Sequence, residues 1–286
     1  MLPASGYVRH FVACNRHDLS HFAPLFIGGK RYGRIKKDLV PFLTNETDVF
    51  EPLSEGYAIA PRATDFASRS EALARITAIL CRCLDKELRN EMYPVIEKWG
   101  DEPLAEADRV AVPWMGFRAW GIHVNGFVRK KDGLYLWIGE RAADRLVDPG
   151  KLDNLIGGGQ PIGLTLEQNL CKEAKEEAGI EASLALTAKQ IRTIDYLYER
   201  PHGLRTDTLF IYDLQLPESF VPRNTDGEVA AFKLMPLDEV ADLICNTDKF
   251  KFNCPLVITD FLMRHGHIAP QNSEYESLKM WLTKAF

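Results

Sequence analysis

A glycine-rich loop that runs directly into an acidic helix constrains the fold of this chain more than any other stretch. The loop spans residues 157–159, and the sequence over residues 166–178 follows a helical pattern. Thr165 occupies the N-cap position, Gln168 completes a capping box, and Gly179 provides a C-terminal stop. The sequence therefore predicts a helix whose start and end are both encoded locally.

Three glutamates share one face of this expected helix. At about 100° per residue, Glu173 and Glu177 lie about 40° apart, and Glu176 lies about 60° to the other side of Glu173. This face borders the apolar stripe, where carboxylates repel each other and lose hydration. A divalent cation with oxygen ligands compensates both effects, which predicts a metal site. The spacing alone also fits a solvated acidic surface, and the glycine loop upstream favours the metal site.

The loop and helix resemble the signature of the Nudix hydrolases, a family that cleaves diphosphates linked to another moiety. That signature is Gly, five residues, Glu, seven residues, Arg-Glu, an apolar residue, any residue, Glu-Glu, any residue, Gly and an apolar residue. The chain matches it at the first glycine, at all three later glutamates and at the final pair, namely Gly158, Glu173, Glu176, Glu177, Gly179 and Ile180. It departs from it at Leu164, where the first Glu stands, and at Lys172, where Arg stands. Because Lys lacks the planar fork of Arg, we expect looser positioning of the neighbouring glutamate.

The resemblance implies a fold class and a set of site residues. The fold is α/β (α+β), a Nudix α/β/α sandwich with a mixed sheet, preceded by a small α/β N-terminal domain. The cofactor is Mg²⁺ or Mn²⁺, with Glu173 positioning or deprotonating water and Lys172 orienting Glu173. The expected metal ligands are Glu173, Glu176, Glu177, the Gly157 carbonyl and Glu228. The expected substrate contacts are Arg118, Arg205, Gly158 and Gly159, with Arg264 as a further candidate.

Length and composition leave room for more than one domain. A chain of 286 residues with 46% hydrophobic content can bury a large core. The polar run 100–108 resembles a linker, so we expect an N-terminal domain over 1–115, a hydrolase domain over 116–267 and a helical extension over 268–286. A cap over the substrate pocket and a homodimer contact are both reasonable roles for the first segment.

Charge and hydropathy exclude several kinds of partner. The formal net charge is -5 and the pI is about 5.9, which gives no general attraction to nucleic acid or to acidic membranes. No apolar run is long enough to span a bilayer, and residues 1–16 lack a signal-peptide layout. We therefore expect a cytoplasmic protein whose partner is a small-molecule diphosphate. The six cysteines show no paired zinc spacing.

Further segments resemble the Nudix proteins related to thiamine pyrophosphokinase. They include residues 149–154, 226–229 and 260–266. This second resemblance implies hydrolysis of thiamine diphosphate, or of oxidised analogues, to the monophosphate and phosphate. Two alternatives remain: a hydrolase of nucleoside diphosphate derivatives such as oxidised nucleotides or ADP-ribose, and a Nudix-fold binding protein without turnover. The aromatic candidates for a heterocycle pocket are Trp114, Phe117, Trp120 and Tyr198, which are equally typical of a core.

Periodicity predicts the other elements. Residues 120–129 and 134–138 should form a hairpin around a Lys-Lys-Asp-Gly turn, and 191–199 and 208–216 should be strands. We expect helices over about 68–87, with Ser68 or Ser70 at its start, over 90–99, and in the C-terminal part of the chain.

Overall fold

The computed structural model describes residues 5–285, and its largest element is a seven-stranded mixed sheet with the order β11-β12-β7-β8-β13. Strand β10 pairs with β7, and β9 pairs with β8. The β7–β12 pair is parallel, and the other pairs are antiparallel. The strands are β7 (Arg118–Lys130), β8 (Gly133–Arg141), β9 (Leu152–Asp153), β10 (Ile156–Gly159), β11 (Lys189–Arg200), β12 (Gly203–Gln215) and β13 (Val229–Pro236).

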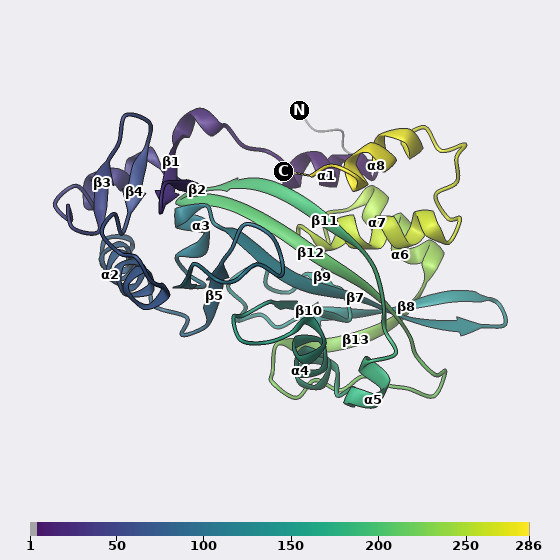
Figure 1. The fold of residues 1–286 in the computed structure, drawn as a ribbon. Helices are drawn as coiled ribbons and strands as arrows, with labels where there is room; N and C mark the ends of the chain where they lie inside the picture. Colours follow the sequence, from purple (N-terminus) through teal and green to yellow (C-terminus); the bar gives the residue numbers. More distant parts are fainter. Residues whose placement is uncertain (1–4, 286) are drawn as a thin grey trace.

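Helices cover both faces of this sheet (Figure 1). Helix α4 (Leu166–Ala178) packs on one face, where Ile122 and Val124 of β7 meet Leu170. On the other face, Ile211 of β12 packs with Phe261 of α7. Successive residues of a strand point to opposite faces, so both sides of the sheet are buried. The second layer contains α1 (Val8–Cys14), α6 (Leu237–Asn246), α7 (Cys254–Arg264) and α8 (Tyr275–Leu282), and α5 (Ala182–Ala185) lies near α4. The expected α/β/α sandwich with a mixed sheet is confirmed.

A smaller α/β unit precedes the large sheet, as expected. Its four-stranded sheet has the order β2-β1-β4-β3, and one long helix packs against it. Its elements are η1 (Leu19–His21), β1 (Phe22–Ile27), β2 (Lys30–Lys36), η2 (Lys37–Phe42), β3 (Phe50–Pro52), β4 (Tyr57–Ile59), α2 (Phe66–Leu84), β5 (Met92–Val95), β6 (Ala105–Asp108) and α3 (Val112–Met115). None of the helices within residues 5–285 is long and apolar enough to cross a membrane.

Two expectations for this unit were wrong. Residues 90–99 do not form a helix, and 100–108 is not a linker, because β5 and β6 pair as an antiparallel hairpin. Tyr93 lies opposite Ala107 in this hairpin, and Val95 lies opposite Ala105. All four side chains are buried. Helix α2 also begins earlier than expected, because the Asp65 side chain accepts a hydrogen bond from the Ser68 amide at 2.8 Å.

Candidate active site

Helix α4 begins and ends where its sequence indicates. The Gln168 amide donates to Thr165 Oγ1 at 3.1 Å, and the Thr165 amide donates to Gln168 Oε1 at 2.9 Å, which completes the capping box. Gly179 closes the helix with a φ of +65°, a conformation that glycine adopts without strain. Local capping therefore fixes the register in which the glutamates of α4 meet the glycine loop.

The glycine loop forms β10, and two glutamates of α4 press directly against it. The Gly157 amide donates to Glu177 Oε2 at 2.8 Å. A Cβ atom at Gly158 would lie only 2.6 Å from Glu173 Oε2, so any larger residue there would displace that carboxylate. The loop thus brings the expected site residues Gly157, Gly158, Glu173 and Glu177 together.

The electrostatics of these two glutamates differ from those of ordinary surface acids. Their exposed fractions are 9% for Glu173 and 8% for Glu177. Burial raises the pKa of Glu177 well above its usual range, and the nearby Glu173 charge raises it further. Burial also raises the pKa of Glu173, although Lys172 partly offsets this effect. Two buried carboxylates that oppose each other's ionisation form a site that a divalent cation would stabilise.

Lys172 bridges the acids on the outer side of the helix. Its Nζ donates to Glu173 Oε1 at 3.1 Å and to Glu176 Oε2 at 2.8 Å. Burial opposes the charged form of Lys172, but the hydrogen bonds to Glu176 and Glu173 raise its pKa overall. Glu176 is the more exposed acid, with 43% of its side chain accessible. This geometry suits the expected role of Lys172 in orienting Glu173.

Replacing Lys172 should therefore slow turnover more than it weakens substrate binding. We expect Lys172→Met to lower kcat roughly tenfold, the scale of losing a group that orients a ligand, with little change in KM. Lys172→Arg should keep most activity because it retains the charge. Steady-state kinetics of both variants checks this expectation, and equal kcat values for Lys172→Met and the wild type would contradict it.

Glu228 lies at a small cavity that also exposes Glu177. Both line this cavity together with Asp153 and Arg141. Glu228 Oε1 forms an ion pair with Arg145 Nη1 at 2.5 Å, and its side chain is 38% exposed. The loop that carries Glu228 therefore places a fourth carboxylate at the cavity that Glu177 lines.

Another group with metal-ligand chemistry lies beneath the sheet, where sequence patterns gave no signal. His123, Asp153 and Cys254 are all buried, and one potential ligand atom from each lies within 4.8 Å of the others. Burial alone would raise the pKa of Asp153, but Lys251, His123 and Arg141 lower it to about 2. Lys251 and Arg141 thus already balance this carboxylate.

His123 and Cys254, which lie next to the Asp153 carboxylate, are also stable without a metal. Burial lowers the pKa of His123 to about 4, and Asn154 fixes its ring through a 2.9 Å hydrogen bond. Burial also raises the pKa of the Cys254 thiol, so this group stays protonated. The charges in this cluster therefore compensate one another, whereas Glu173 and Glu177 are two acids whose pKa values burial raises.

The three candidate arginines occupy different places. Arg118 Nη1 donates to Thr208 Oγ1 at 2.8 Å and lies 3.3 Å from Asp195. Arg205 pairs with Asp207 at 2.8 Å. Arg264 forms ion pairs with Asp213 and Asp260, inside a buried polar network that joins α7 to the sheet. Among the aromatic candidates, Trp114, Phe117 and Trp120 are buried in hydrophobic cores and Tyr198 is half-buried against Phe252.

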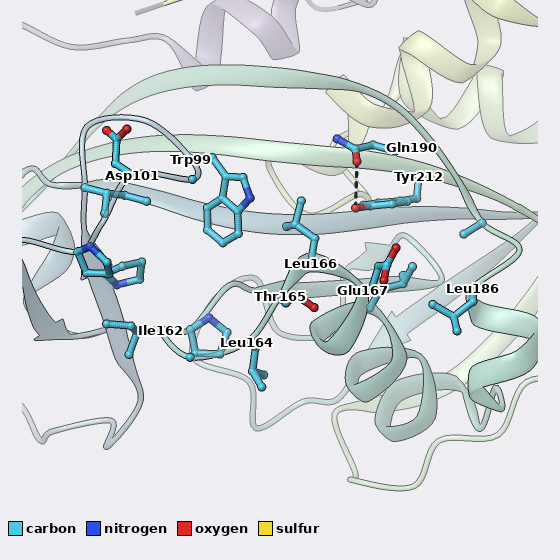
Figure 2. Close-up of a pocket in the computed structure, with 18 residues that line it drawn as sticks. Trp99, Asp101, Ile162, Leu164, Thr165, Leu166, Glu167, Leu186, Gln190 and Tyr212 are labelled. Atoms are coloured by element: carbon cyan, nitrogen blue, oxygen red, sulfur yellow. Dashed lines mark hydrogen bonds between the residues drawn. The ribbon is translucent and has the colours of Figure 1, made fainter.

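An open cavity of about 690 Å³ lies between the β5–β6 hairpin and the first turns of α4 (Figure 2). Trp99 and Leu166 point into the same space, and Tyr212 lies deeper on the sheet. Leu164, at the departing position of the signature, lines this cavity. The lining contains the carboxylates of Asp101 and Glu167 but no Lys or Arg within the described part of the chain. Such a lining suits a flat apolar or cationic group and does not suit a diphosphate.

A glycine loop on a mixed sheet and a capped acidic helix with buried carboxylates are features of a diphosphate hydrolase of the Nudix type. Sequence comparison agrees: residues 120–253 match the NUDIX domain, and residues 6–119 match a domain of unknown function, DUF4743. The chain belongs to the Nudix hydrolase family and is a Nudix-type diphosphate hydrolase.

Relatives share nearly the whole chain. Nudix hydrolase 20, chloroplastic, of Arabidopsis thaliana is 37% identical over 287 residues, covering 96% of this chain and 76% of that protein. Nudix hydrolase 24, chloroplastic, of the same organism is 37% identical over 279 residues, with the same two coverages. The solved structure of DR0079 from Deinococcus radiodurans aligns at 20% identity and a TM-score of 0.44, over 59% of this chain and 98% of that one. The cytoplasmic location of this chain stays a prediction.

Proposed function

We propose that this protein hydrolyses a small-molecule diphosphate with Mg²⁺ or Mn²⁺ held by Glu173, Glu176 and Glu177. The observation that carries the proposal is the state of Glu177. It is buried beside Glu173, it accepts a hydrogen bond from the Gly157 amide, and it forms no ion pair within residues 5–285. Oxygen ligands in this arrangement fit a hard divalent cation, with the Gly157 carbonyl and Glu228 as further ligands.

The residues of the chain divide the chemistry between them. A bound cation would lower the pKa of water and neutralise phosphate oxygens. Glu173 is placed to position that water and to accept its proton, and Lys172 keeps Glu173 in place. Attack of the water oxygen on one phosphorus breaks the bridging P–O bond and releases two phosphate-containing products. Positioning and charge neutralisation therefore supply most of the catalysis.

We propose thiamine diphosphate or its oxidised analogues as the substrate. The support is the resemblance of segments outside the signature to the Nudix proteins related to thiamine pyrophosphokinase. One of these segments contains Asp153 and Asn154, and another contains Glu228, so two of them border the small cavity next to Glu177. Hydrolysis of nucleoside diphosphate derivatives would use the same carboxylates and differ only in the organic group that is bound.

Phosphate release by the purified protein tests both levels of this proposal. We expect turnover with Mg²⁺ or Mn²⁺, none in EDTA, and a preference for thiamine diphosphate or oxo-thiamine diphosphate over ADP-ribose and 8-oxo-dGTP. A preference for either nucleotide compound would overturn the substrate and leave the hydrolase. Metal binding without turnover of any of the four would favour a Nudix-fold binding protein.

A further inference from the structure

The β5–β6 hairpin of the N-terminal unit touches the glycine loop directly. The Ile162 amide donates to the Met92 carbonyl at 2.8 Å, which ties the loop to β5. A Cβ atom at Gly159 would overlap the Tyr93 hydroxyl and would lie 3.6 Å from Arg109 Cζ. Because Gly159 has no side chain, the Tyr93 hydroxyl can occupy this position, and the Arg109 guanidinium lies nearby.

Arg109 lies beside this hydroxyl, and the charge of Arg205 acts on it from β12. Arg109 lies 5.7 Å from the centroid of the Tyr93 ring, and its charge and that of Arg205 both lower the pKa of Tyr93 against the larger, opposite effect of burial. Arg109 Nη1 pairs with Glu91 Oε2 at 2.6 Å, yet 49% of the Arg109 side chain is exposed. Arg205 carries the second guanidinium from β12. Guanidinium groups of this kind bind phosphate oxygens through two parallel hydrogen bonds.

Tyr93 and Arg109 lie on the face of β10 opposite to Glu173 of helix α4. Consecutive strand residues point to opposite faces, so Gly158 faces Glu173 while Gly159 faces Tyr93 and Arg109. Within the described residues, β10 pairs with no strand but β7, and on its outer edge the Gly157 amide donates to Glu177 while the Gly159 carbonyl accepts from Asn169 Nδ2 at 2.9 Å. The Glu91 charge also raises the pKa of Glu173, so the two sides of this edge lie within electrostatic range of each other.

We propose that Tyr93 and Arg109 of the N-terminal unit form the anion-binding half of the diphosphate site. A diphosphate along the outer edge of β10 contacts the metal carboxylates on one side and these donors on the other. The large cavity cannot supply this contact, since its described lining has no Lys or Arg. The inference rests on the proposed function and makes the N-terminal unit a part of the substrate site.

Binding of imidodiphosphate, a non-hydrolysable diphosphate, tests the proposal by calorimetry in Mg²⁺. We expect Arg109→Gln to weaken binding roughly tenfold, the scale of a lost charge-assisted hydrogen bond, and Tyr93→Phe to weaken it several-fold. Glu91→Gln should strengthen binding about threefold, because it removes the carboxylate that competes for Arg109. The affinity for Mg²⁺ alone should be the same in Arg109→Gln, Tyr93→Phe and the wild type.

Arg75→Gln is the matched control, since Arg75 is also a half-exposed arginine of this unit that pairs with carboxylates. It should bind imidodiphosphate like the wild type. Wild-type affinity in both Arg109→Gln and Tyr93→Phe, or no binding by the wild type, would overturn the proposal. Wild-type binding that these variants weaken, without turnover of any diphosphate, would overturn the proposed function and support this inference. Turnover of a diphosphate with an unchanged KM in Arg109→Gln would support the proposed function and overturn this inference.

Discussion

Glu177→Gln should abolish turnover and at the same time stabilise the protein when metal is absent. Losing a group that only orients a ligand costs about 10–100-fold, so losing a direct ligand should cost at least about 100-fold in activity. The metal-free wild type must either bury an ionised carboxylate beside Glu173 or take up a proton there, and both cost free energy that the amide variant avoids. This stabilisation follows from the burial of Glu177, which helical periodicity alone does not reveal.

The stabilisation should amount to several degrees in EDTA at pH 7. The desolvation penalty that the variant relieves is on the order of 1–3 kcal/mol, and 1 kcal/mol shifts the melting temperature by about 2–4 °C for a chain near this size. Folding raises the pKa of Glu177, so its contribution is fully present below the unfolded pKa of about 4.3 and is lost as pH rises through the folded pKa. The wild type should therefore lose stability between acid and neutral pH, and the variant should lose less. Equal melting temperatures in EDTA across that range would contradict this account.

Gly158→Ala should inactivate the enzyme through a single methyl group. The added Cβ would lie 2.6 Å from Glu173 Oε2 and would move that carboxylate. The φ of Gly158 is not positive, so alanine imposes no backbone strain there and the effect is purely steric. A shift of about 1 Å at a reacting group can cost about 100-fold, which is the loss of kcat that we expect.

The neighbouring glycine provides the matched control. A Cβ atom at Gly157 would have its nearest neighbour at 3.4 Å, on the His123 ring, which is close to ordinary contact distance. Gly157→Ala should therefore keep activity within a few-fold of the wild type. Both variants should be measured for kcat and for Mg²⁺ affinity. Equal activity of Gly158→Ala and Gly157→Ala would show that the position of Glu173 does not limit turnover.

Local signals predicted the catalytic helix well. The capping box of Thr165 and Gln168 and the stop at Gly179 act within a few residues of the helix ends, so sequence contains all the information they need. The pairing of Glu173 and Glu177 on one face also follows from helical periodicity. Their burial does not, because it depends on the contact between α4 and β10.

Elements that depend on distant partners were predicted less well. Residues 90–99 have enough apolar spacing to resemble a helix, but β5 is fixed by its pairing with β6. Tyr93 and Arg109 carry no motif and lie about 50 residues or more before the glycine loop, so only the folded chain brings them to Gly159. Likewise, Arg264 lies in a motif, yet its ion pairs with Asp213 and Asp260 place it in a network that joins α7 to the sheet.

The packing of α1 has a consequence for how this protein can be dissected. Although α1 belongs to the segment that matches DUF4743, it contacts α7 and α8, and the Tyr7 amide donates to Glu274 at 2.7 Å. From α1, beside the C-terminal helices, the chain crosses to the small sheet and returns through β7 (Figure 1). A cut at the border between the two matched segments would strip α1 from the larger piece and expose the apolar surface that it covers. The two segments are thus an evolutionary division of the sequence that does not correspond to two separable bodies.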